Sequence, residues 1–135
     1  SGHDVEAAQR FLEAKERYPV GSEDWAGATA EAFKMLAQKG CAEVAKPEWW
    51  NDKELKALSA RVVRWAPKTG QAALMRAVVL AGQCGASWGA GPRSAAELKE
   101  AATHYERAAA LFPAPGLKAQ HAGHAAWCCG QAEAM

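Results

Sequence analysis

The amino-acid sequence predicts an all-α protein, and three observations support this fold class. Alanine, the strongest helix former, supplies 33 of the 135 residues. Isoleucine is absent, and leucine, valine and phenylalanine together supply only 19 residues, so side chains that suit a pleated sheet are scarce. Turns that contain proline recur at Pro19, Pro67 and Pro113, at intervals of 48 and 46 residues. We therefore expect helices that are organised as a repeat.

An amphipathic helical pattern precedes each of these three prolines. Proline has no amide donor and its ring clashes with the preceding turn, so each helix should end before it. The third pattern begins with Ser94 and Glu97, whose spacing is typical of a capping box. The predicted helices cover residues 5–18, 53–65 and 94–112.

A second helical pattern follows each proline, which gives six helices in all. These patterns cover residues 22–39, 70–84 and 116–133. Gly40, Gly85 and Gly130 stand near their ends as candidate left-handed caps, although Gly130 could equally lie inside its helix. The short proline turns make the two helices of each pair antiparallel neighbours, whereas the linkers over residues 41–51 and 86–93 are longer.

The helix expected over residues 70–84 is apolar on nearly every side. Arg76 is its only charged residue. A helix of this kind is expected to be buried between layers. Three hairpins stacked side by side would place it in the middle of a solenoid.

The helix before two of the prolines resembles the second helix of a tetratricopeptide repeat. That helix has a small residue, an aromatic residue four positions later, another small residue three positions after that, and a proline five positions further on. The matching sets are Ala7, Phe11, Ala14, Pro19 and Ala101, Tyr105, Ala108, Pro113. The middle copy keeps only Pro67. Trp25 and Gly123 each match one position of the family's first helix, and the repeats here exceed the usual length of about 34 residues.

This resemblance implies a right-handed α-solenoid of three antiparallel helix pairs, and a protein-protein interaction module that acts as a scaffold or adaptor. In the family, the first helix of each pair lines a concave groove that binds a peptide or a partner helix. The corresponding partner-binding groove is formed here by Phe33, Lys34, Leu74, Val78, Gln120, His124 and Trp127. One subgroup clamps a carboxylate with lysines and asparagines. Ala26 and Ala30 occupy the corresponding positions, so this clamp is not expected.

No sequence motif indicates catalysis, and we expect neither an enzyme nor a cofactor. A glycine-rich phosphate loop, a nucleophile elbow and a paired Cys-x-x-Cys are all absent. His121, His124 and Cys128 recur at helical spacing and are weak candidates for zinc ligands. The sequence offers no fourth ligand. The alternative is that the three side chains lie unligated on the groove or at the end of the solenoid.

Charge and cysteine content suggest where the protein acts. A net charge of +1 gives no field that would attract nucleic acid or an anionic membrane. Four cysteines are too few and too unevenly spaced for a secreted disulfide framework, which favours reduced thiols and an intracellular, cytoplasmic location. Residues 1–3 resemble the remnant of a cleaved tag. Residues 4–135 are then expected to form a single domain within a larger protein.

Three features leave alternatives open. The basic residues Lys53, Lys56, Arg61 and Arg64 form either a solvated face or a site for an anion or a nucleic acid. The tryptophans Trp49, Trp50 and Trp88 either pack over helix ends or anchor an interface. The last helix has little polar surface, so further repeats, a second copy or a partner should cover it. A metal-binding or small-ligand-binding domain, or the docking domain of a larger enzyme, are the alternative functions.

Overall fold

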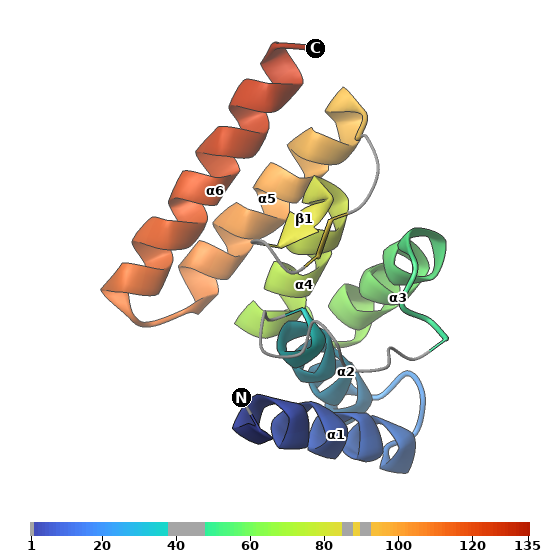
Figure 1. The fold of residues 1–135 in the computed structure, drawn as a ribbon. Coiled ribbons are helices and arrows are strands. Elements are labelled where there is room, and N and C mark those ends of the chain that lie inside the picture. Colours follow the sequence, from blue (N-terminus) through green and yellow to red (C-terminus); the bar gives the residue numbers. More distant parts are fainter. Residues whose placement is uncertain (1, 38–47, 85–87, 90–92) are drawn as a thin grey trace.

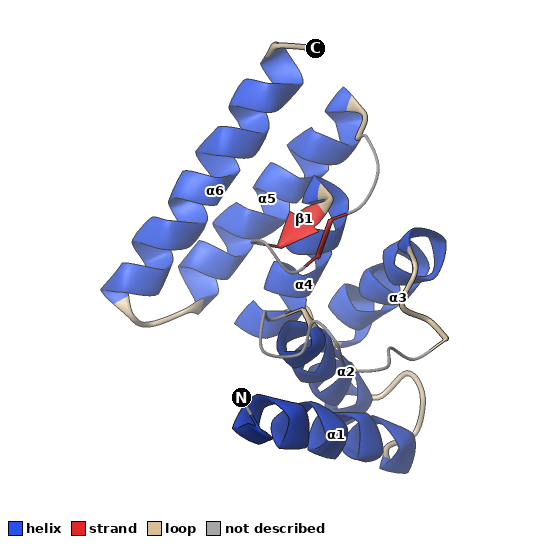
Figure 2. Cartoon of the chain, viewed as in Figure 1, coloured by secondary structure: helices blue, strands red, loops and turns tan. Residues whose placement is uncertain are grey.

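The computed structural model describes residues 2–37, 48–84, 88–89 and 93–135, which form six helices and one very short pair of strands. The helices are α1 (Gly2–Arg17), α2 (Glu23–Leu36), α3 (Asp52–Trp65), α4 (Gly70–Ala81), α5 (Ala95–Leu111) and α6 (Pro115–Glu133). The strands β1 (Gln83–Cys84) and β2 (Trp88–Gly89) pair antiparallel. Figure 2 shows how small this pairing is beside the helices. The predicted all-α class is confirmed.

Side-chain caps fix where several helices begin. The Ser22 side chain accepts a hydrogen bond from the amide of Trp25 at the start of α2. The Asn51 side chain does the same for α3. The predicted capping box of Ser94 and Glu97 is present at the start of α5. These contacts satisfy amides that the first turn of a helix leaves unpaired.

The last helix ends at Glu133 as predicted, whereas α4 does not reach its predicted end. α4 ends three residues earlier than expected, because Gly82 adopts a left-handed conformation with φ of 82°. Gly130 does not cap α6 but lies inside it. Gly40 and Gly85 lie outside the described residues.

Consecutive helices pack against each other along the chain. α2 contacts α1, α3 and α4, and α4 contacts α3 and α5. α5 lies between α4 and α6 (Figure 1). Among the described elements, α6 makes extensive contact with α5 alone.

The core is centred on α4 and extends into its neighbours. Nine residues of α4 are buried, which confirms the predicted burial of this helix. Trp25 of α2, Leu55 of α3 and Tyr105 of α5 belong to the same apolar cluster. None of the described helices is long and apolar enough to cross a bilayer.

Candidate functional site

Two of the predicted groove residues are buried in the core and do not line an open surface. Phe33 is 2% exposed and its ring lies 5.2 Å from that of Trp50. Val78 is 8% exposed and belongs to the same apolar cluster. In the free chain both side chains are covered, because α2 packs on α4 and Trp50 packs against Phe33, and their role in binding a partner stays a prediction.

The remaining predicted groove residues are separated into two groups. Leu74 of α4 is partly buried against the core, and Lys34 of α2 is exposed. Gln120, His124 and Trp127 are exposed on α6. Because α5 lies between α4 and α6, the seven residues are not brought together on one surface (Figure 1).

His121, one of the candidate zinc ligands, lies in an aromatic layer between α5 and α6. Its ring lies 5.2 Å from Phe112 and 6.4 Å from Tyr105, and His121 is only 4% exposed. Neither ring nitrogen has a hydrogen-bond partner among the described residues. Burial lowers the pKa of His121 below its usual 6.5, and the nearby His124 lowers it further.

The three candidate zinc ligands do not converge. Cys128 is fully buried on the side of α6 that faces α5, whereas His124 is exposed. Burial raises the pKa of the Cys128 thiol to about 11, with a smaller effect from Cys129, so this thiol is a poor nucleophile at neutral pH. Within the described ranges, no three His, Cys, Asp or Glu side chains form a group that could hold a metal ion.

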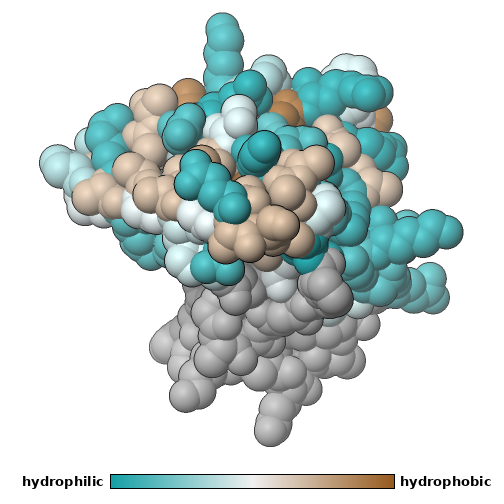
Figure 3. Space-filling view, turned by 90° about the horizontal axis from the view of Figure 1, so that it is seen from above, coloured by the Kyte–Doolittle hydropathy of each residue, from teal (hydrophilic) through white to brown (hydrophobic). Residues whose placement is uncertain are grey.

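The opposite side of α6 is exposed and carries mostly glycine and alanine. We call this side the α6 outer face; its residues are Gly116, Ala119, Gly123, Ala126, Trp127 and Gly130, all exposed. A Cβ atom built on any of the three glycines would meet no atom of the described residues within 4 Å. Trp127 is 44% exposed. Figure 3, which views the molecule from above, shows pale brown, mildly apolar residues interspersed with hydrophilic teal ones.

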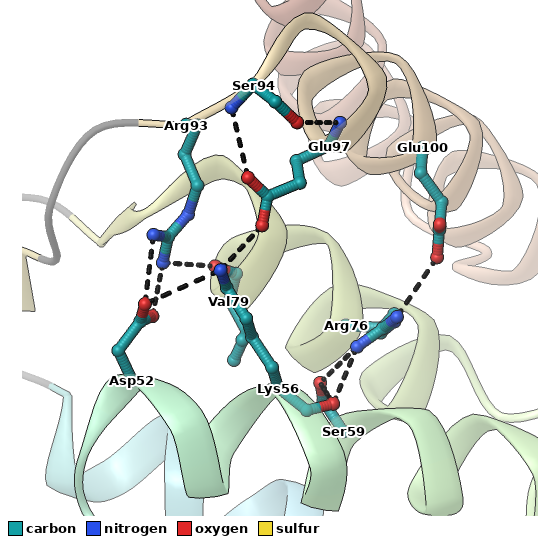
Figure 4. A network of polar contacts seen from close by, with 9 residues as sticks. All are labelled: Asp52, Lys56, Ser59, Arg76, Val79, Arg93, Ser94, Glu97 and Glu100. Carbon is teal, nitrogen blue, oxygen red and sulfur yellow. Dashed lines mark hydrogen bonds and ion pairs between the residues drawn. The ribbon is translucent and has the colours of Figure 1, made fainter.

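A network of polar contacts joins the start of α3 to the start of α5 (Figure 4). The guanidinium of Arg93 donates to both carboxylate oxygens of Asp52 and to the carbonyl of Val79. The Arg93 side chain is only 4% exposed. The ammonium of Lys56 lies 2.6 Å from a carboxylate oxygen of Glu97. This hydrogen bond from Lys56 is the main reason that the pKa of Glu97 is lowered from 4.5 to about 2.

Arg76, the only charged residue of α4, extends this network between three helices. Its guanidinium donates to the Lys56 carbonyl and the Ser59 hydroxyl of α3, and to a carboxylate oxygen of Glu100 on α5. These contacts satisfy the charge of a side chain that is only 15% exposed. We interpret the network as structural, because its charged groups are paired with one another.

A cavity of about 220 Å³ lies between the end of α1, the start of α2 and one side of α3. Two cations line it, and both lie over the indole ring of Trp25. The Lys15 ammonium is 5.6 Å from the ring centroid, and the Arg61 guanidinium carbon is 5.2 Å from it. The Lys15 ammonium also lies 5.7 Å from the ring of Trp49. Sequence analysis did not predict this cavity, because its residues come from separate segments.

A second cavity, of about 340 Å³, lies mainly between α1 and α2. Two aromatic residues, Phe11 and Tyr18, line it together with three carboxylates and several small residues. The acidic residues are Glu23, Asp24 and Glu31. Figure 1 shows that the α1 and α2 hairpin, which contributes to both cavities, lies at the opposite end of the molecule from α6.

Comparisons with known proteins assign no family to this chain. No protein-family model matches the sequence, and neither the curated proteins nor the solved structures include a significant match.

Proposed function

We propose that the chain is a protein-protein interaction module, a scaffold or adaptor, that binds an α-helix of a partner protein on the α6 outer face. The observation that carries this proposal is an exposed helix side made of glycine and alanine next to an exposed Trp127. The partner site therefore differs in position from the groove that the sequence predicts.

Contacts among the described residues give the glycines of α6 no packing role. Glycine in the interior of a helix is less stable than alanine by roughly 1 kcal/mol. At Gly123 and Gly130, alanine would fit without a contact within 4 Å. Gly123 lies well inside the helix and Gly130 lies in its last turn, and neither is the capping residue. A second helix that approaches α6 closely would give these glycines a function.

The spacing of the small residues matches the seam between two packed helices. Gly116, Gly123 and Gly130 are seven residues apart, and Ala119 and Ala126 each follow a glycine by three residues. This is the heptad spacing of a coiled-coil interface. A helix, rather than an extended peptide, is the occupant that this spacing favours.

The charges of α6 indicate an apolar centre for this interface. No Asp, Glu, Lys or Arg occurs between Lys118 and Glu133. Trp127 stands at the edge of the seam, and exposed tryptophans are typical anchors of protein interfaces. We infer that the partner helix presents an apolar stripe with a small-residue or alanine-rich centre.

The proposed module is a stack of hairpins related to the tetratricopeptide type. The contact between α2 and α4 supports stacking of the first two hairpins. The third hairpin joins this stack through α5, and α6 stands at the end of the stack. An exposed helix side of a solenoid is normally polar, so the exposed apolar side of α6 favours a binding role.

Leucine at Gly123 tests the proposal. The side chain has open space in the free chain, so the variant should fold, but it would hold a partner helix away from α6. A matched control is Gln131→Leu, which adds the same side chain at an exposed position on a different side of α6. Proteins bound by the wild-type chain should be lost with Gly123→Leu and retained with Gln131→Leu. A photo-crosslinker at Ala126 should join the same partner.

Two results would contradict the proposal. Equal binding by wild type and Gly123→Leu would place the site elsewhere. Sedimentation equilibrium could also reveal a dimer that Gly123→Leu dissociates, and the occupant would then be a second copy instead of a different protein.

A further inference from the structure

We propose that the cavity between α1, α2 and α3 binds a carboxylate that carries a small apolar or aromatic group. This site lies away from α6 and is independent of the interaction described above. Its residues come from the end of α1, the start of α2, the segment before α3 and one side of α3.

Two cations in this cavity have no carboxylate partner. Among the described residues, no carboxylate oxygen lies within 4 Å of the Lys15 ammonium or the Arg61 guanidinium. Both cations instead lie over the ring of Trp25, at 5.6 and 5.2 Å. Contacts with an aromatic face offset only part of the repulsion between two like charges that line one small cavity. An anion in the cavity would be attracted by both.

The ring beneath the cations carries an unpaired donor. Trp25 is 2% exposed, and its indole N–H has no acceptor among the described residues. Buried donors are nearly always paired, so an unpaired one needs an explanation. Because Trp25 lines the cavity, the resonance of this N–H is expected to respond to a ligand that binds there.

The rest of the lining selects the group attached to the carboxylate. Val20, Ala57 and Leu58 contribute apolar atoms, and Trp49 adds a second indole. Among the described lining residues Glu54 is the only acidic one, and with Lys15 and Arg61 these residues carry a net charge of +1. A volume of about 220 Å³ suits a phenyl or branched alkyl group. The favoured ligand is therefore a small acid with an apolar body, either free or as part of a peptide.

Phenylacetate is a suitable probe, and nitrogen-15 NMR can follow its binding. The indole resonance of Trp25 is assigned through the Trp25→Phe variant. Addition of phenylacetate should shift this resonance in a saturable manner, and the neutral analogue phenylacetamide should bind at least about tenfold more weakly, which corresponds to about 1.4 kcal/mol. Equal affinity for the two compounds would refute the anion site, as would the absence of any shift.

Charge-neutral variants test which cations take part. Arg61→Gln and Lys15→Gln should each weaken phenylacetate binding about tenfold, because each removes a charged donor. Arg64→Gln is the matched control, since Arg64 lies on the same helix, is exposed and does not line the cavity. An equal effect of Arg61→Gln and Arg64→Gln would show that general charge, rather than this cavity, attracts the acid.

A blocked dipeptide distinguishes a free acid from a protein ligand. Acetyl-phenylalanyl-glutamate amide carries its carboxylate only on a side chain. Binding that is tighter than that of phenylacetate, and that Arg61→Gln weakens, supports an acidic segment of a partner protein. Binding of phenylacetate without binding of the dipeptide supports a small free acid.

Discussion

Replacement of His121 by leucine should stabilise the chain, and the gain should grow as the pH falls from 7 to 5. The imidazole is 4% exposed, and both of its nitrogens lack partners among the described residues. A buried polar group without a partner costs roughly 1–3 kcal/mol. Leucine removes that cost but loses ring contacts with Phe112 and Tyr105 that contribute roughly 0.5–1.5 kcal/mol. We expect a net gain of about 1 kcal/mol at pH 7.

The pH dependence follows from the lowered pKa of His121. Below pH 6.5 the unfolded chain binds a proton at this residue, whereas the folded chain resists it because the ring is buried. The stability of the wild type therefore falls as the pH falls below 6.5. At pH 5, one and a half units lower, the loss reaches at most about 2 kcal/mol, since each unit corresponds to about 1.36 kcal/mol. The leucine variant lacks this loss.

Urea unfolding followed by circular dichroism at pH 7 and pH 5 measures both effects. The matched control is His124→Leu, which changes an exposed histidine of the same helix and should leave most of the pH dependence in place. If wild type and His121→Leu lost the same free energy of unfolding between pH 7 and pH 5, the assignment of a buried neutral imidazole would be wrong. A variant less stable than wild type at both pH values would show that the ring contacts outweigh the unpaired nitrogens.

Three further predictions concern the polar network and its surroundings. Glu97→Gln should be less stable than wild type at pH 7. The difference in stability should disappear as the pH falls from 4.5 to about 2, because the wild-type carboxylate then becomes protonated. Acid titration of both proteins, followed by circular dichroism, measures this difference. Asp52→Ala should lower the free energy of unfolding in urea by about 2 kcal/mol. This is less than the loss expected for a fully buried ion pair, because the Asp52 side chain is 40% exposed. A loss below about 0.5 kcal/mol would show that the ion pair with Arg93 contributes no more than a solvent-exposed pair. Gly82→Ala should lower the stability by about 1–2 kcal/mol, because φ is +82° and the new Cβ would lie 3.0 Å from Arg93; an unchanged midpoint in thermal unfolding would contradict this.

The sequence predicts those features of the fold that depend on neighbouring residues. Proline positions, helical periodicity and the pairing of Ser94 with Glu97 are local, and they locate the helices and the start of α5 correctly. The scarcity of charge in α4 also predicts its burial, because Arg76 is its only charged group. The sequence does not predict that α4 ends at Gly82, because Gly85, three residues further on, is an equally good candidate for a left-handed cap.

Features that depend on distant contacts were not predictable in this way. The ring of Phe33 packs against that of Trp50, which belongs to a different segment of the chain. Helical periodicity around Phe33 does not predict this contact. The separation of α6 from α4 depends on how α5 packs against both helices. The cavity around Lys15 and Arg61 requires α1 and α3 to lie beside the same ring of Trp25. The spacing of residues within one helix does not predict contacts between different helices.

The attachment of α6 to a single neighbour has a mechanical consequence. Because α5 is the only described element against which it packs extensively, this helix can detach without breaking the contacts among α1, α2, α3 and α4. Under a force applied at Met135, α6 would peel away first, and the remaining helices would bear the load only afterwards. Its backbone amides would also exchange with deuterium sooner than those of α4, which packs against α2, α3 and α5.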